Sequence, residues 1–167
     1  RDSFLKEKGF DQAFPTVDDL TRSMGNVSFY YQGRIIENIR ISNTVDAYAV
    51  NGWESMKLEN HSGIVDNYRF PKGDPEVMAR YNAPLYLAVK MNRKVVSTGD
   101  TTLVDTYIVN EKNLKGSYIL NLVAKDESGN VVASHKERVT VKGGNDYGQC
   151  LQSGWAFIPK SKGYTRI

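Results

Sequence analysis

An indole, a carboxylate and a carboxamide lie close together in the sequence at Trp53, Glu54 and Asn51. An aromatic ring stacks on the C–H face of a sugar, while carboxylates and amides form hydrogen bonds with sugar hydroxyl groups. We therefore interpret these three residues as a candidate substrate-binding group for carbohydrate. The alternative is that Trp53 is simply a packed aromatic side chain at the end of an apolar segment.

Hydrolysis of a glycosidic bond would need more than this group. It uses two carboxyl groups that lie about 5–9.5 Å apart. The candidates near Trp53 are Glu54, Glu59 and Asp66. Their spacing in sequence does not fix a distance in space, and charged loop residues are usually solvated. We therefore assign no catalytic residue.

Motifs for other chemistries are missing. His61 and His135 lie far apart, and neither has an acid or a cysteine at metal-ligand spacing, so we expect no metal site. The glycine-rich run 143–148 does not open a helix, which argues against a dinucleotide-binding loop, and we expect no cofactor. Asn26 and Asn60 each begin an N-glycosylation sequon, which is a short and non-specific match.

Helices are expected on both sides of the candidate group. Thr16 and Asp19 resemble a capping box, which predicts a short helix over about 17–24 that ends at Gly25-Asn26. The isoleucine spacing that follows predicts a second helix over about 28–42.

The candidate group itself follows an apolar run. Residues 45–50 predict a short buried strand, and a helix followed by such a strand is typical of a parallel α/β unit. After the loop, Asp74-Pro75 begins another helix that stops near Asn82, because Asp is a good N-cap and Pro is tolerated at the first helical position.

The periodicity changes to two from Leu85 onward. Short alternating segments separated by turn residues predict an antiparallel β-sandwich that is immunoglobulin-like in the broad sense. The expected strands are 85–91, 103–109, 118–124, 131–133, 138–142 and 155–158. The predicted fold class is therefore α+β, with an N-terminal α/β element over 1–83, a sandwich over 84–143 and a C-terminal strand and tail over 144–167.

Composition limits the classes of function. The chain has 167 residues, a net charge of +3, one cysteine and no apolar stretch long enough to span a membrane. We expect neither a nucleic acid nor a membrane as partner, and no intrachain disulfide. The chain lacks a starting Met and an apolar signal segment, so we expect a mature or excised piece. The single cysteine leaves export open, and we expect a periplasmic or extracellular location.

Three short motifs resemble glycoside hydrolase family 2, the group of β-galactosidases, β-mannosidases and β-glucuronidases. They are Gly52-Trp-Glu, Ser62-Gly-Ile-Val-Asp66 and Phe70-Pro-Lys72. In that family an aromatic-Gly-aromatic-acid pattern ends the eighth barrel strand, and a loop and helix lead to an immunoglobulin-like sandwich. The similarity covers roughly residues 30–142 and is sharpest over about 25 of them. Val50 departs from the pattern, because the family usually has Trp there.

The resemblance implies that the chain is the C-terminal portion of a β-glycosidase. Trp53 and Glu54 would line or border the sugar subsite. The two catalytic glutamates of the family lie on the fourth and seventh barrel strands, which would precede this chain, so we expect the chain alone to be inactive. The implied partners are carbohydrate and the remainder of the parent glycosidase.

Two other functions fit the sequence. A non-catalytic carbohydrate-binding module would need exposed coplanar aromatic side chains on the sandwich, with Tyr86, Tyr107, Tyr118 and Trp155 as candidates. A purely structural adhesion or spacer domain would present a flat surface around Trp53.

Overall fold

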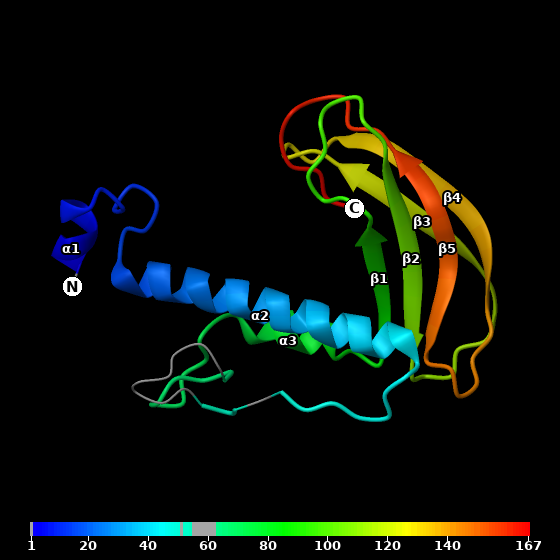
Figure 1. Cartoon of the computed structure of the whole chain (residues 1–167), viewed down its shortest axis with the longest axis horizontal. Helices are drawn as coiled ribbons and strands as arrows, with labels where there is room; N and C mark the ends of the chain where they lie inside the picture. Colours follow the sequence, from blue (N-terminus) through cyan, green and yellow to red (C-terminus); the bar gives the residue numbers. More distant parts are fainter. Residues whose placement is uncertain (1, 51, 55–62) are drawn as a thin grey trace. The chain divides into compact units, whose positions relative to one another are not determined.

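The protein has helices and antiparallel sheets, so the predicted α+β class with a sandwich-like arrangement is confirmed (Figure 1). The computed structural model describes residues 2–50, 52–54 and 63–167. They form two compact units. The first comprises Arg1–Ile39 and Thr44–Ala83, and the second comprises Arg40–Asn43 and Pro84–Ile167.

The first unit contains helices α1 (Asp2–Glu7) and α3 (Pro75–Tyr81), and α2 (Val17–Ser42) as far as Ile39. The predicted capping box begins α2, since the Thr16 hydroxyl accepts the Asp19 N–H at 3.1 Å and the Asp19 carboxylate accepts the Thr16 N–H at 3.1 Å. The predicted start of α3 is also confirmed, because the Asp74 carboxylate accepts the Glu76 N–H at 3.0 Å.

The predicted break at Gly25-Asn26 is wrong, because α2 continues through both residues. They serve a tertiary contact instead. A Cβ atom on Gly25 would lie 1.7 Å from the carbonyl oxygen of Lys72, so only glycine allows this approach. Beside it, the Asn26 side-chain oxygen accepts the N–H of Asp74 at 2.6 Å. Gly and Asn often end helices, but in this helix they allow the segment that precedes α3 to pack closely against it.

One side of α2 carries the core of the first unit. Helix α3 lies alongside α2 (Figure 1). Phe29 and Ile36 of α2 pack with Met78 of α3. A Cβ atom on Gly33 would lie 2.0 Å from the ring of Tyr81, so glycine is again required for the two helices to approach. Burial raises the pKa of the Tyr81 hydroxyl, and the nearby Glu37 carboxylate raises it further by a smaller amount. The phenol is therefore neutral.

The prediction of a short buried strand over 45–50 is wrong. These residues are not part of a strand, and all but Val50 are exposed. A buried strand needs neighbouring strands on which to form hydrogen bonds, and among the described residues this segment has none. Its apolar character is used differently: Val50 packs against the core of the first unit, and the Tyr48 hydroxyl donates to the Asn82 side-chain oxygen at 2.6 Å.

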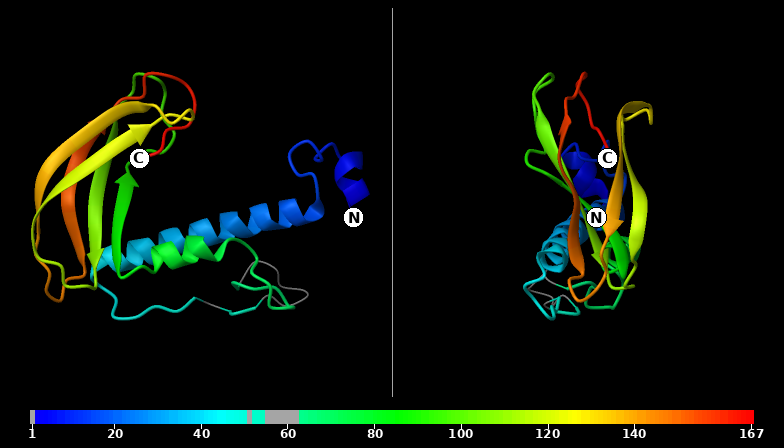
Figure 2. Two further views of the ribbon diagram at one scale, coloured as in Figure 1. Left: turned by 180° about the vertical axis from the view of Figure 1, so that it is seen from behind. Right: turned by 90° about the vertical axis from the view of Figure 1, so that its right-hand side faces the viewer.

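The second unit is built from five antiparallel strands in two sheets. One sheet has the order β1-β2-β5 and the other pairs β3 with β4. The right-hand view of Figure 2 shows the two sheets as separate layers. The strands are β1 (Leu85–Met91), β2 (Thr102–Asn110), β3 (Gly116–Lys125), β4 (Val131–Val141) and β5 (Gly148–Phe157).

Alternating side chains from both sheets fill the sandwich core. Val104 and Phe157 of one sheet contact Ala124 of the other, while Leu120, Leu122 and Val139 form a second cluster that Trp155 also contacts. The two segments predicted at 131–133 and 138–142 are one strand, β4. The polar residue His135 hid this continuity in the sequence, and its ring stacks on Trp155 at a centroid distance of 5.7 Å.

Strand β5 is longer than the predicted 155–158, and it pairs with β2. The sequence pattern misses its first half because the register between β2 and β5 shifts near Thr106. Asp105 holds this irregularity in place: one of its carboxylate oxygens accepts the Ser153 hydroxyl and the Gly154 N–H, each at 2.7 Å.

Replacing Asp105 with alanine is expected to lower the free energy of unfolding by about 1–2 kcal/mol, because two hydrogen bonds to a charged acceptor are lost at a partly exposed position. Denaturant unfolding measures the change. Asp105→Asn is the matched control, since it keeps an oxygen acceptor and should lose less than Asp105→Ala. Equal losses in the two variants would contradict this role of the carboxylate.

Among the described residues, no helix is both long and apolar enough to cross a membrane.

Candidate functional site

The candidate site lies in the first unit, where Trp53 and Glu54 are joined to the loop 63–72. The Trp53 carbonyl oxygen accepts the N–H groups of Ile64 at 3.0 Å and Val65 at 3.1 Å. Val65 then forms a parallel bridge with Glu54 and an antiparallel bridge with Pro71. Three backbone segments are therefore fastened side by side, and they fix the backbone from which the Trp53 side chain extends.

Large side chains on these segments are exposed. The indole of Trp53 is 64% exposed, and Tyr68 and Phe70 are 75% and 68% exposed. Solvent-exposed aromatic residues on backbone segments that are hydrogen-bonded to one another are typical of ligand-binding surfaces. Trp53 therefore differs from the packed aromatic residue that was the alternative interpretation.

The charged residues of the site form one loose pair. Nε of Arg69 lies 3.8 Å from a carboxylate oxygen of Glu54, with side-chain exposures of 80% and 45%. This distance exceeds that of a hydrogen bond, so the contact is a weak surface ion pair. Both groups remain open to a ligand.

Asp66 shapes the loop. Its carboxylate oxygen Oδ1 accepts the N–H of Tyr68 at 2.8 Å and that of Phe70 at 2.9 Å. Its backbone also takes part, because the Asp66 N–H donates to the Phe70 carbonyl and the Asp66 carbonyl accepts the Arg69 N–H, both at 2.9 Å. This carboxylate is engaged in holding a turn, so we interpret it as a positioning residue for the site.

Replacing Asp66 with alanine is expected to loosen the loop, because two backbone N–H groups lose their acceptor. We expect a loss of about 1–2 kcal/mol in unfolding free energy and faster amide exchange at Tyr68 and Phe70. Hydrogen exchange followed by NMR measures both amides. Unchanged exchange in Asp66→Ala, with Asp46→Ala as an exposed control, would contradict this role.

Several sequence-predicted residues lie outside the described residues: Asn51, the third member of the candidate substrate-binding group, together with Glu59, Asn60 and His61. The structure therefore brings Trp53 and Glu54 together with residues 63–72 but does not test Asn51. The sequon at Asn26 lies inside α2, where the Asn26 side-chain oxygen already accepts the Asp74 N–H.

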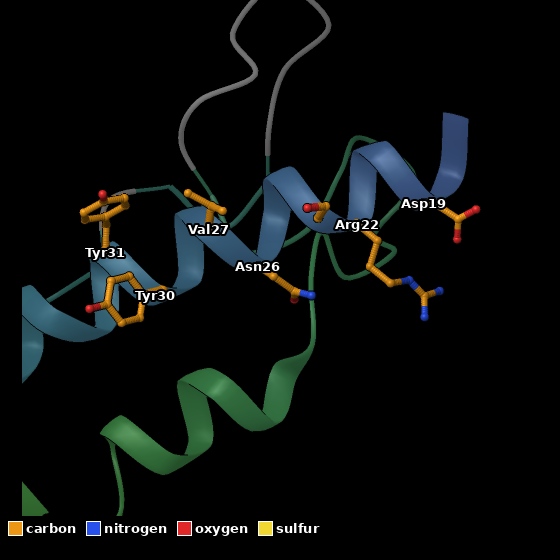
Figure 3. Close-up of a pocket in the computed structure, with 7 residues that line it drawn as sticks. Asp19, Arg22, Asn26, Val27, Tyr30 and Tyr31 are labelled. Carbon is orange, nitrogen blue, oxygen red and sulfur yellow. The ribbon is translucent and has the colours of Figure 1, made fainter. Parts of the chain in front are cut away.

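Two pockets open on α2 within the first unit. Figure 3 shows one, an open groove of about 510 Å³ in which Asp19, Arg22, Asn26 and Tyr30 extend from successive turns of the helix. Tyr30 and Tyr31 meet edge to face at a centroid distance of 5.4 Å. Neither Trp53 nor Glu54 lines this groove.

The second pocket, of about 520 Å³, is lined by α2 and by the loop residues Asp66, Pro71 and Lys72. Partial burial lowers the pKa of Lys72. The helix and the loop therefore line one pocket, and the backbone of Lys72 and Gly73 lies directly against Gly25 of α2.

Sequence reasoning missed Tyr68, Arg69 and Phe70 as members of the site. Aromatic residues on both sides of an arginine in a polar loop were the signal available, but their exposure depends on the turn that Asp66 forms. Among the described residues, no group of three or more His, Cys, Asp or Glu side chains is placed to hold a metal ion.

Comparisons with known protein families, curated proteins and solved structures found no match to this chain.

Proposed function

We propose that the chain is the C-terminal portion of an exported β-glycosidase, in which it contributes one wall of the sugar site and a supporting β-sandwich. The parent enzyme would hydrolyse β-glycosidic bonds in oligo- or polysaccharides by the two-carboxylate route. One observation carries the proposal: a solvent-exposed indole at Trp53 extends from a hydrogen-bonded backbone, and the next residue in the chain is the exposed Glu54.

This arrangement suits a sugar for physical reasons. The indole offers a flat apolar surface, and Glu54 with Arg69 offers an acceptor and donors for hydroxyl groups. Holding the backbone in place reduces the entropy lost when a ligand binds. Carbohydrate is therefore the partner that the site supports best, with Asn51 as a further predicted contact.

An exposed apolar stripe on α2 supports the second partner, the remainder of a parent protein. Met24, Val27, Tyr31 and Ile35 recur at helical spacing and are all exposed. A stripe of this kind usually marks a surface that packs against other protein. The sequence motifs then suggest that this protein is the rest of a glycosidase barrel.

The alternative, a carbohydrate-binding or structural sandwich module, has less support. Trp155 contacts both core clusters of the second unit and stacks on His135. The Tyr118 hydroxyl donates to the Lys115 carbonyl oxygen at 3.1 Å. The contacts of Trp155 pack it into the sandwich and leave it unsuited to serve as an exposed platform, whereas Tyr118 is 39% exposed.

Calorimetric titration with β-linked tetrasaccharides, cellotetraose and mannotetraose among them, tests the proposal. We expect binding that Trp53→Ala weakens by about thirtyfold and Trp155→Phe leaves unchanged. Binding that depends on Trp155 would favour the sandwich module. Absence of binding to every oligosaccharide tested would favour the structural spacer.

The chain alone is expected to release no aglycone from aryl β-glycosides above the background rate. Asp66 is engaged in the turn, so among residues 53–54 and 63–72 Glu54 is the one carboxylate left for a reaction that needs two. A chromogenic assay measures release. Turnover by the chain that disappears in Glu54→Gln would contradict this expectation.

A further inference from the structure

We propose that this site takes an acidic glycan, whose carboxylate binds the guanidinium group of Arg69. The inference rests on the proposed function, since it specifies the class of sugar that the same loop receives. Three features of the loop carry it: the backbone conformation of Arg69, the open donors of its side chain, and the aromatic residues on either side.

The backbone of Arg69 is in the left-handed region, with φ of 68°. This conformation is uncommon for residues other than glycine, asparagine and aspartate, so the surrounding structure must hold it. Asp66 does so through its carbonyl, which accepts the Arg69 N–H, and through its carboxylate, which accepts the N–H of the residues before and after Arg69. The loop therefore fixes, at an energetic cost, where the Arg69 side chain leaves the backbone.

The donors of the guanidinium group are available. The nearest described carboxylate is that of Glu54. It lies 3.8 Å from Nε of Arg69, which is beyond hydrogen-bond range, and the Arg69 side chain is 80% exposed. A planar guanidinium matches a carboxylate in a bidentate arrangement that neutral hydroxyl groups do not reproduce. Arg69 also offsets the negative charge of Glu54, which would otherwise repel an anionic ligand.

Exposed aromatic residues flank this charge. Tyr68 and Phe70 precede and follow Arg69, and Trp53 is fastened to the same loop through Ile64 and Val65. A loop that carries exposed aromatic side chains next to an arginine in sequence suits a ligand that has both C–H surfaces and a carboxylate. A uronic acid residue within a glycan combines the two.

The test compares two matched pairs of β-1,4-linked tetrasaccharides, mannuronate with mannose and glucuronate with glucose. Within each pair the sugars differ only in a carboxylate that replaces a hydroxymethyl group. Calorimetry at low salt is expected to show about tenfold tighter binding of one acidic sugar than of its neutral partner. Arg69→Gln should remove this preference, so that the acidic and the neutral sugar of a pair bind with the same affinity. Arg138→Gln, which removes the same charge from an exposed position on β4, should keep it.

The outcomes separate the two proposals. If neutral sugars bind through Trp53 but the acidic partners bind no tighter, the acidic-glycan inference is wrong and the carbohydrate site stands. The inference is also overturned if the preference for the acidic sugar survives in Arg69→Gln, or if Arg138→Gln removes it as well. Either result would attribute the preference to the net charge of the protein. If none of the four sugars binds, both proposals fail.

Discussion

Replacing Gly25 with alanine is expected to destabilise the protein by about 2 kcal/mol, although the same change on an exposed helix surface stabilises by about 1 kcal/mol. The sign reverses because the added Cβ atom would lie 1.7 Å from the Lys72 carbonyl oxygen and 2.9 Å from the Gly73 backbone nitrogen. Both obstacles are backbone atoms, so a side-chain rotation cannot relieve the overlap. The segment that carries Lys72 must move away from α2.

Thermal unfolding measures this effect, with an expected fall in Tm of about 6 °C. Ser23→Ala, two residues earlier on the same helix, is the matched control and should change stability by less than about 0.5 kcal/mol. The displaced segment continues into the loop 63–72, so Gly25→Ala should also weaken oligosaccharide binding although Gly25 is buried beneath that segment. A Gly25→Ala variant that is more stable than the parent protein would contradict the described approach of the loop to the helix.

Replacing Trp53 with alanine is expected to weaken oligosaccharide binding by about thirtyfold, which corresponds to about 2 kcal/mol. The estimate follows from losing about 80–100 Å² of apolar contact at about 25 cal/mol per Å². Stability should change by less than about 0.5 kcal/mol, because the indole is mostly exposed and its backbone hydrogen bonds remain.

Calorimetry on the folded variant separates this loss of affinity from a loss of structure. Trp53→Phe should recover part of the affinity, since it keeps a smaller aromatic face. Tyr164→Ala is the matched control, because Tyr164 is an exposed aromatic residue of the second unit and is not a member of the candidate site. A Trp53→Ala variant that binds as tightly as the parent chain would show that the indole is not part of a sugar site.

Local signals in the sequence were sufficient for much of the fold. The capping residues Thr16 and Asp74 and the alternation after Leu85 each act over a few residues, so they predicted the starts of α2 and α3 and the strands β1 to β3. Predictions failed where a residue serves a distant contact. Gly25 has the chemistry of a helix end, yet its partner is Lys72, which lies far along the chain.

The candidate site shows the same division. Trp53 and Glu54 were predicted from residue type alone, and both are exposed beside the loop. Arg69 was not predicted, because its position depends on hydrogen bonds from Asp66 that form only in the folded loop. The run 45–50 was predicted as a buried strand because it is apolar. The sequence of a segment does not show whether a neighbouring strand is present to pair with it.

The central claim is that Trp53, and not the sandwich, meets the sugar. The two tryptophans give two indole N–H signals in a ¹H–¹⁵N NMR spectrum, which Trp53→Phe and Trp155→Phe assign. On titration with a β-linked tetrasaccharide, the Trp53 signal is predicted to shift in a saturable manner while the Trp155 signal stays in place. A saturable shift of Trp155 alone, or no shift of either signal, would contradict the claim.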